Sequence, residues 1–188
     1  MIEFAFPMDA GTFFTMVIYA IAFGFPIFMC NSFANFSKIV PFLGTPVDFG
    51  RTWKDKRILG DHKTWRGLIF GILFGTIAGV IVWYVCTIQY NVFTIYPWYL
   101  GFFISIGDHF ADLLGSFTKR RIGIKSGGAL PLYDQGSWMI TGMLFALPFV
   151  WSEPNFWFYF VTLCIATPVL HFLTGFLAYW GGIKDVWY

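Results

Sequence analysis

Charged residues are scarce in this chain. Lys, Arg, Asp and Glu make up 12% of its 188 residues, which is about half of the roughly 25% typical of soluble domains. Hydrophobic residues make up 57%, and phenylalanine alone supplies 25 residues. This composition excludes an ordinary soluble domain and indicates an integral membrane protein.

Several motifs of soluble enzymes are also missing. The cysteines, Cys30, Cys86 and Cys164, lie in apolar stretches without zinc-type spacing, so we expect them to be small buried hydrophobic side chains. No Walker-type Gly-rich loop precedes a Lys-Ser or Lys-Thr pair, which excludes a P-loop enzyme. There is no Ser/His/Asp set: Ser116 has no base beside it, and His171 is expected in the core.

Five apolar segments are long enough to cross a bilayer core of about 30 Å. We predict membrane-spanning helices at residues 12–36, 66–90, 96–117, 137–152 and 156–181. The fourth is short and contains Pro148. We find no internal repeat and no second domain. The expected fold is an all-α bundle of five transmembrane helices that forms a single integral membrane domain over residues 1–188.

The placement of the cations predicts the orientation in the membrane. All twelve Lys and Arg residues fall in or beside the loops 37–65 and 118–136 or in the C-terminal tail, which five spans place on one side. The other side carries Glu3, Asp9 and Glu153 and no cation. The positive-inside rule therefore predicts an outside N-terminus, a cytoplasmic C-terminus and cytoplasmic loops in the cell membrane.

The third span carries a polar stripe. Successive steps of three or four residues place five polar side chains on one helical face: Ser105, Asp108, Asp112, Ser116 and Lys119. An aspartate at the centre of a membrane helix costs about 2.5–3.5 kcal/mol, so both aspartates need partners or a function. One interpretation is an Asp–Arg or Asp–Lys pair that holds helices together.

We favour a second interpretation of the stripe, a cation site completed by Asp134 from the second loop. Carboxylate oxygens suit Mg²⁺, which also shares phosphate oxygens. The candidate metal ligands are Asp108, Asp112 and Asp134. His109 is on a different face from the stripe, where we expect a packed or pore-lining histidine.

Both loops mix cations with glycine, as phosphate sites do. Arg fits phosphate oxygens as a fork, Lys is a compact charge, and Thr64 precedes a helix start, where N–H groups favour phosphate. The candidates for phosphate binding are Lys63, Arg66, Lys119, Arg120 and Lys125. For Lys54, Lys56 and Arg57 we favour attraction to anionic lipid heads.

The stretches ADLLGSFTKRRIGIKSG and LPLYDQ resemble the signature of membrane CTP-dependent cytidylyltransferases, and PVDFG and LGDHKTWRG resemble their archaeal branch, the CDP-archaeol synthases. The resemblance implies catalytic roles for Asp112, Lys119, Arg120 and Asp134. It implies substrate binding by Lys63, Thr64, Arg66, Gly67, Ser116, Arg121 and Lys125, with Asn35 and Asp48 as weaker candidates. Ala111 replaces a usual glycine and Ser137 an expected acidic residue, so Asp108 is our candidate for the missing carboxylate.

The reaction that this resemblance implies joins CTP to 2,3-bis-O-(geranylgeranyl)-sn-glycerol 1-phosphate, with CDP-archaeol and pyrophosphate as products and Mg²⁺ as cofactor. A phosphomonoester is largely dianionic at pH 7, so it needs no general base. No nucleic-acid partner is expected. Three alternatives stay open: a phosphatidate cytidylyltransferase for diacyl lipids, a small ion channel or transporter, and a non-catalytic scaffold.

Overall fold

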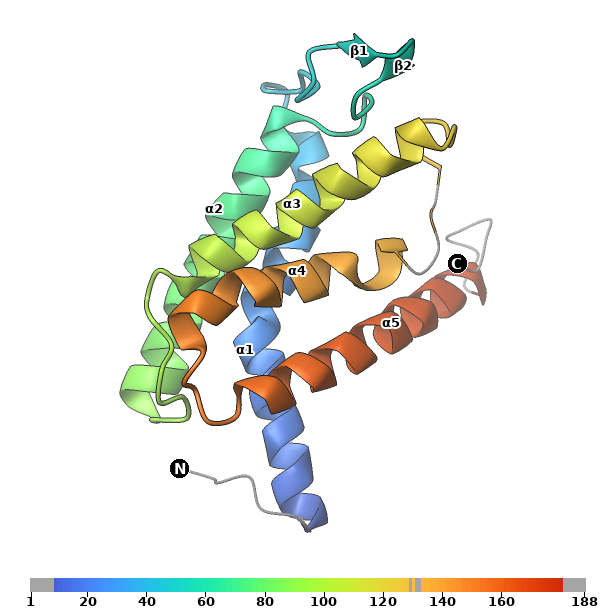
Figure 1. The fold of residues 1–188 in the computed structure, drawn as a ribbon. Helices are drawn as coiled ribbons and strands as arrows, with labels where there is room; N and C mark the ends of the chain where they lie inside the picture. Colours follow the sequence, from blue (N-terminus) through green and yellow to red (C-terminus); the bar gives the residue numbers. More distant parts are fainter. Residues whose placement is uncertain (1–8, 129, 131–132, 181–188) are drawn as a thin grey trace.

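The structure, a computed structural model, describes residues 9–128, 130 and 133–180, with the backbone alone for 170–179. Five long helices dominate it (Figure 1). They are α1 (Ala10–Phe36), α2 (Trp65–Val82), α3 (Leu100–Arg121), α4 (Tyr133–Val150) and α5 (Phe156–Trp180). A short 3₁₀ turn, η1 (Ser37–Ile39), follows α1, and a π-helical segment, η2 (Trp83–Gln89), extends α2. The all-α prediction is confirmed.

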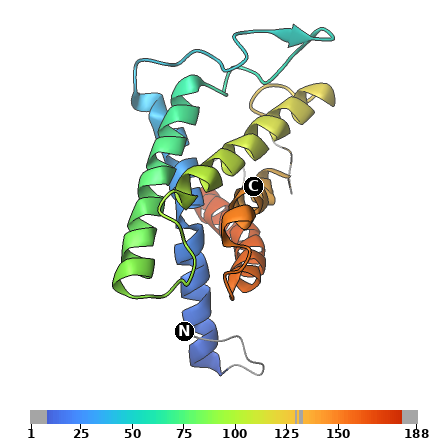
Figure 2. The ribbon, with the colours of Figure 1, turned by 60° about the vertical axis from the view of Figure 1, so that its left-hand side comes forward.

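The helices form two groups with different tilts. α1 and α2 run antiparallel along the long axis of the molecule, whereas α3, α4 and α5 cross it obliquely (Figures 1 and 2). A two-stranded antiparallel hairpin, β1 (Thr52–Trp53) and β2 (Lys56–Arg57), lies beyond the first residues of α2 and the last turns of α3. This hairpin belongs to the long basic loop between α1 and α2.

Two of the long helices, α1 and α2, start at residues whose side chains cap them. The carboxylate of Asp9 accepts a hydrogen bond of 2.9 Å from the backbone N–H of Thr12 and so caps α1. The hydroxyl of Thr64 accepts one of 3.4 Å from the N–H of Gly67 and caps α2. The α2 start predicted from Thr64 is therefore present, and its free N–H groups lie at the basic end of the molecule.

α2 and α3 approach each other through glycines. A Cβ placed on Gly101 would lie 2.6 Å from the Cα of Gly79, which is closer than real Cβ contacts allow. The two backbones therefore touch, as small residues permit in membrane bundles. This contact fixes the position of α3, which carries the predicted polar stripe.

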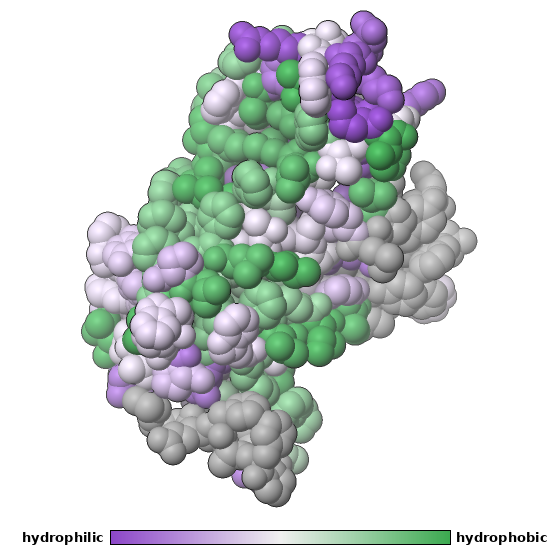
Figure 3. All heavy atoms as spheres, in the orientation of Figure 1, coloured by the Kyte–Doolittle hydropathy of each residue, from purple (hydrophilic) through white to green (hydrophobic). Residues whose placement is uncertain are grey.

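The outward surface is apolar over most of the molecule and polar at one end. Large apolar side chains such as Phe14, Ile18 and Ile165 are more than 60% exposed. Figure 3 shows hydrophilic residues concentrated over the hairpin end. Two helical stretches, Ala10–Ile39 and Trp65–Gln89, have by themselves the length and apolarity to cross a membrane. A shorter apolar helical stretch is Phe156–Val169.

Three boundaries differ by four residues from the predicted spans: α3 begins at Leu100 instead of residue 96, and its end and the start of α4 are also shifted. α3 continues to Arg121, so Lys119, Arg120 and Arg121 occupy its last turn instead of the following loop. α4 begins at Tyr133, so Asp134 lies in its first turn. These last two shifts have one cause, because cations near a helix C-terminus and anions near an N-terminus are stabilised by the helix dipole. The predicted end of the last span, residue 181, lies outside the described residues.

Candidate active site

Two cavities lie at the hairpin end of the bundle. The larger, of about 520 Å³, is lined by α1, by residues 61–68 and by α3. The smaller, of about 260 Å³, is lined by the last turns of α3, by residues 126–128 and by Asp134. His62, Lys63 and Gly127 line both. The two cavities are therefore neighbours that share one wall, and Lys63 lies in it.

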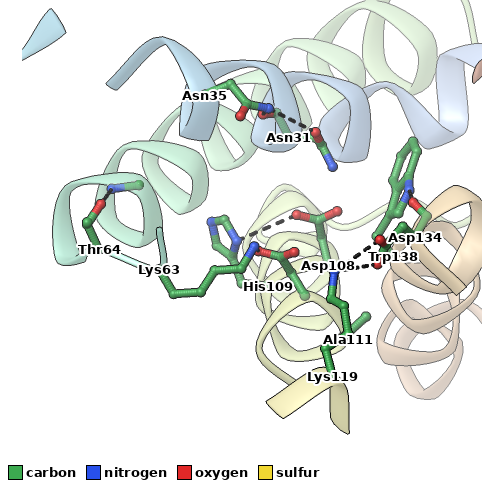
Figure 4. A network of polar contacts seen from close by, with 12 residues as sticks. Asn31, Asn35, Lys63, Thr64, Asp108, His109, Ala111, Lys119, Asp134 and Trp138 are labelled. Atoms are coloured by element: carbon green, nitrogen blue, oxygen red, sulfur yellow. Dashed lines mark hydrogen bonds and ion pairs between the residues drawn. The ribbon is translucent and has the colours of Figure 1, made fainter. Parts of the chain in front are cut away.

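Two of the predicted aspartates line these cavities and form ion pairs with lysines. The Nζ of Lys63 lies 2.5 Å from Oδ2 of Asp112. The Nζ of Lys119 lies 2.9 Å and 3.0 Å from the two carboxylate oxygens of Asp134 (Figure 4). Asp112 lines the larger cavity and Asp134 the smaller. The pairs link the loop to α3 and α3 to α4, so they also tie elements together, as the alternative interpretation of the stripe proposed.

Asp108 has a different environment. It is 1% exposed, and its Oδ2 accepts a hydrogen bond of 3.2 Å from the thiol of Cys30. Its Oδ1 is buried and has no hydrogen-bond partner among the described residues. Because Asp108 also lines the larger cavity, this oxygen is an acceptor that a bound cation could satisfy.

Most of the predicted phosphate-binding residues line the two cavities. Lys63, Thr64, Arg66 and Gly67 line the larger one, and Ser116, Lys119 and Arg120 line the smaller. Arg66 donates a hydrogen bond of 2.8 Å to the carbonyl of Val40. Arg120 donates one of 2.8 Å to the carbonyl of Lys125. Their backbone partners hold the two guanidinium groups in fixed positions.

Arg121 and Lys125 do not line either of these cavities. The guanidinium of Arg121 donates to the carbonyls of Trp53, Lys56 and Arg57 at 2.5, 3.1 and 2.6 Å. It also lies 5.3 Å from the ring centroid of Trp53. Arg121, which was predicted to bind substrate, therefore holds the hairpin against the end of α3 in this structure.

Asp48, a weaker candidate, holds the loop together. Its carboxylate accepts hydrogen bonds from the guanidinium of Arg57 and from the backbone N–H groups of Leu59, Gly60 and Gly50. Burial alone would raise the pKa of the Asp48 carboxyl, but these hydrogen bonds hold it well below its usual value. The ionised carboxylate thus fixes the loop that presents Lys63.

Sequence reasoning missed part of the cavity wall. Asn31 lines the larger cavity beside Asn35, across from Asp108 (Figure 4). Two amides four residues apart in an otherwise apolar helix were the available signal. His109, expected on a different face from the stripe, also lines this cavity. It fits there because Gly71 faces it, and a Cβ at Gly71 would overlap with its imidazole.

Comparison with known proteins identifies the family. Residues 13–188 match the family model described as CarS-like, CDP-archaeol synthase. The chain belongs to the CDP-archaeol synthase family. It is 39% identical over 155 residues to the CDP-archaeol synthase of Pyrococcus horikoshii, which covers 82% of this chain and 89% of that protein. It is 32% identical over 180 residues to that of Methanococcus aeolicus, covering 92% of this chain and 99% of the relative.

A solved structure of an intramembrane enzyme for archaeal membrane lipid biosynthesis has the same architecture. The TM-score is 0.66 at 28% identity, over 84% of this chain and 93% of that one. The resemblance stated from the sequence motifs is thereby confirmed. Membership in the CDP-archaeol synthase family makes this chain a membrane enzyme of the cytidylyltransferase type.

The two positions that depart from the family signature lie next to the site. Ala111, in place of glycine, is buried in α3, and its carbonyl accepts a hydrogen bond of 3.1 Å from the hydroxyl of Tyr133. Ser137 lies in α4, three residues after Asp134. Asp108 supplies a carboxylate to the larger cavity, so all three aspartates predicted as metal ligands line the two cavities although Ser137 is not acidic.

Proposed function

We propose that this chain transfers the cytidylyl group of CTP to the phosphate of an isoprenoid glycerol-phosphate lipid and releases pyrophosphate, with CDP-archaeol as the product. One observation carries the assignment of this reaction to the two cavities. Lys63, in the shared wall, lies within ion-pair distance of Asp112, and Lys119, in the smaller cavity, lies within ion-pair distance of Asp134. A nucleoside triphosphate needs cationic side chains for its phosphates and carboxylate oxygens for the metal ion that accompanies it.

The cationic side chains provide the phosphate site. Lys63 lies in both cavities, and Lys119 and Arg120 line the smaller one. The N-terminus of α2 adds backbone N–H groups and the positive end of its dipole, next to the cap residue Thr64. Arg120, held by the carbonyl of Lys125, and the α2 N–H groups are in place before substrate arrives, so they can stabilise the negative charge that develops on pyrophosphate.

The aspartates fit Mg²⁺. All three offer hard carboxylate oxygens, the ligands that this ion prefers, and Oδ1 of Asp108 is buried without a hydrogen-bond partner among the described residues. We assign Asp112 and Asp134 as its ligands, with Asp108 as the third. When bound, Mg²⁺ would neutralise charge on phosphate oxygens and orient them for displacement.

The protein needs no base for this chemistry. The attacking group is a lipid phosphate oxygen that is already ionised at neutral pH, and the obstacle is the repulsion between two phosphate anions. Lys63 and Lys119 would reduce this repulsion. Their ammonium groups pair with aspartates at the cavities and can exchange these partners for phosphate oxygens when substrate enters. The described residues would thus position the two phosphate groups and offset their negative charge.

The exposed apolar faces and the basic hairpin end support a proposal for the position of the lipid and for the orientation in the membrane. We propose that the prenyl chains lie along the exposed apolar faces of the bundle, with the phosphate reaching the cavities from the membrane side. The basic hairpin end then faces the cytoplasm, where CTP is, and Asp9 and Glu153 mark the outer side. An ion channel is less compatible with two cavities that both lie at the hairpin end of the molecule.

The test uses the purified full-length protein in detergent with labelled CTP, a diether glycerol-phosphate lipid and MgCl₂. We expect a labelled CDP-lipid only when all three are present. A parallel reaction with diacyl phosphatidate measures the preference for the acceptor, and substantially faster turnover of the diacyl lipid would favour the phosphatidate alternative. Cation flux through liposomes without CTP, combined with no CDP-lipid, would contradict the proposal.

A further inference from the structure

Three buried side chains that the proposed reaction does not use together form a compact cluster. Cys30 comes from α1, and Asp108 and His109 come from α3. The Sγ of Cys30 lies 3.2 Å from Oδ2 of Asp108 and 3.6 Å from Nε2 of His109. Nδ1 of His109 lies 3.7 Å from Oδ2 of Asp108. One ligand atom from each residue lies within 4.8 Å of the other two.

These separations match the ligand shell of a tetrahedral transition-metal ion. Zn²⁺ binds sulfur at about 2.3 Å and nitrogen or oxygen at about 2.0–2.2 Å, which places neighbouring ligand atoms about 3.3–3.6 Å apart. The two contacts of Sγ lie at or near this range. A single ion takes only one nitrogen of an imidazole, so the contacts of Nε2 and Nδ1 belong to alternative ligand sets. One ligand atom of each residue lies within 4.8 Å of the other two, so the side chains would move toward the ion in order to bind it.

A second observation points to a ligand at the same place. Oδ1 of Asp108 is buried and has no hydrogen-bond partner among the described residues, although the side chain is only 2% exposed. Hydrogen bonding with the Cys30 thiol accounts for Oδ2 alone. A bound cation would neutralise a carboxylate that is otherwise costly to bury.

The packing leaves room for the cluster and gives it access to water. Gly71 faces the imidazole of His109, and a Cβ at Gly71 would also lie 3.0 Å from the carbonyl oxygen of Cys30. Asp108 and His109 both line the larger cavity. An ion held by the three side chains would thus have its remaining coordination position at the floor of that cavity.

We propose that Cys30, Asp108 and His109 form a binding site for a thiophilic divalent cation of the Zn²⁺ class, which shares Asp108 with the proposed Mg²⁺ ligands and adds a thiol and an imidazole. Thiolate and imidazole favour ions such as Zn²⁺ and Co²⁺, whereas Mg²⁺ selects oxygen. Binding replaces the proton of the Cys30 thiol by the metal ion and releases that proton to water in the cavity.

Occupancy of this site has a consequence for the reaction, and this part rests on the proposed function. The ion would engage the Asp108 carboxylate, which we assign as the third Mg²⁺ ligand, and would lie at the floor of the cavity that we assign to the nucleotide. We therefore expect Zn²⁺ to inhibit turnover in the presence of excess Mg²⁺.

Binding is tested on the full-length protein in detergent by titration with CoCl₂ in excess MgCl₂. We expect a near-ultraviolet thiolate-to-cobalt charge-transfer band that saturates at one equivalent and is displaced by ZnCl₂. Cys30→Ser should abolish the band. His109→Gln, which keeps the thiol, should weaken Co²⁺ binding at least tenfold. Cys86→Ser is the matched control, because its thiol lies in η2 away from the cluster, and it should keep the band.

Absence of the band in the wild-type protein, or its persistence in Cys30→Ser, would overturn the site. Circular dichroism and thermal unfolding show whether each variant is folded, and the His109→Gln titration decides the matter if Cys30→Ser does not fold. Zn²⁺ inhibition is then measured relative to the Mg²⁺-dependent rate of each variant. A cobalt band without inhibition leaves the metal site intact and overturns only its regulatory effect, so the two failures are distinguishable.

Discussion

Replacement of Asp112 by asparagine separates the chemistry of the site from its contribution to stability. The Asp112–Lys63 pair is partly exposed, with 47% and 26% of the two side chains accessible. Exposed pairs of this kind contribute about 0–1 kcal/mol. In a protein of this size that corresponds to a shift in the unfolding midpoint of at most about 4 °C. Asparagine is close in size, so the loop and α3 should keep their positions.

The expected effect on the reaction is much larger. Removal of one preorganised electrostatic group from an active site typically lowers the rate by about 10²–10³-fold, or about 2.7–4 kcal/mol in the barrier. Loss of a carboxylate that we propose as a metal ligand and that pairs with Lys63 should reach at least this range. We therefore expect Asp112→Asn to unfold within a few degrees of wild type and to lose at least about 10²-fold in turnover.

The assay is the initial rate of CDP-lipid formation from labelled CTP, next to a thermal unfolding curve of the same sample. Asp55→Asn is the matched control. It makes the same chemical change in the hairpin turn, outside both cavities, at a φ of 59° that asparagine tolerates well. Turnover of Asp112→Asn within threefold of this control would refute the metal and charge role of Asp112.

Three further outcomes are expected. Lys119→Ala removes a cation from the smaller cavity and should lower kcat/KM for CTP at least tenfold in the same assay; a change in expression alone would contradict this. Gly79→Ala forces a methyl group against the backbone of Gly101 and should cost about 1–3 kcal/mol of stability, seen as a lower unfolding midpoint. Burial raises the pKa of the Glu153 carboxyl, although the N–H of Ile95 donates to it at 2.7 Å. The folded state therefore favours the protonated form, and wild type loses stability as pH rises above the ordinary glutamate value of about 4.3. Glu153→Gln should match wild type at low pH and become increasingly more stable than wild type as pH rises, as thermal unfolding across a pH series would show.

The number and approximate positions of the helices were predictable because a bilayer favours long apolar segments. Spacing along one helical face also brought Asp108, Asp112, Ser116 and Lys119 together as candidates. The end of α3 was less predictable, since a run of cations is compatible either with a loop or with the C-terminal turn of a helix. Hydropathy alone favours the loop.

The roles of single charges were harder to infer. Arg121 and Arg120 are adjacent in the sequence, yet Arg121 donates to carbonyls of the hairpin more than sixty residues away, while Arg120 lines a cavity. The hairpin position depends on the buried Asp48 carboxylate and its hydrogen bonds. Such long-range pairings leave no periodic signal, so a basic motif predicts a phosphate site without showing which cations serve it.

The same limit explains Cys30 and His109. Each is unremarkable in its own helix, one thiol and one imidazole among apolar neighbours. They meet because glycines let the helices approach closely, and Gly71 accepts the His109 ring. Asp108 is then surrounded by polar side chains from both helices. The chemistry of this cluster follows from tertiary packing and could not be read from the spacing of its residues.

Charge balance connects the fold to the proposed reaction. Aspartates and lysines near the end of a membrane bundle are costly when isolated, and the structure pairs them: Lys63 with Asp112, and Lys119 with Asp134. The pairs stabilise the site before substrate binds. They also make it responsive, because a nucleotide phosphate competes for each ammonium and a divalent cation competes for each carboxylate. When nucleotide and metal ion bind together, each lysine pairs with phosphate and each aspartate with the metal ion, so no charge is left uncompensated. When only one of them binds, one member of each broken lysine–aspartate pair is left without a partner. The contacts that allow these side chains to lie in the bundle are thus the same contacts that favour joint binding of nucleotide and metal ion.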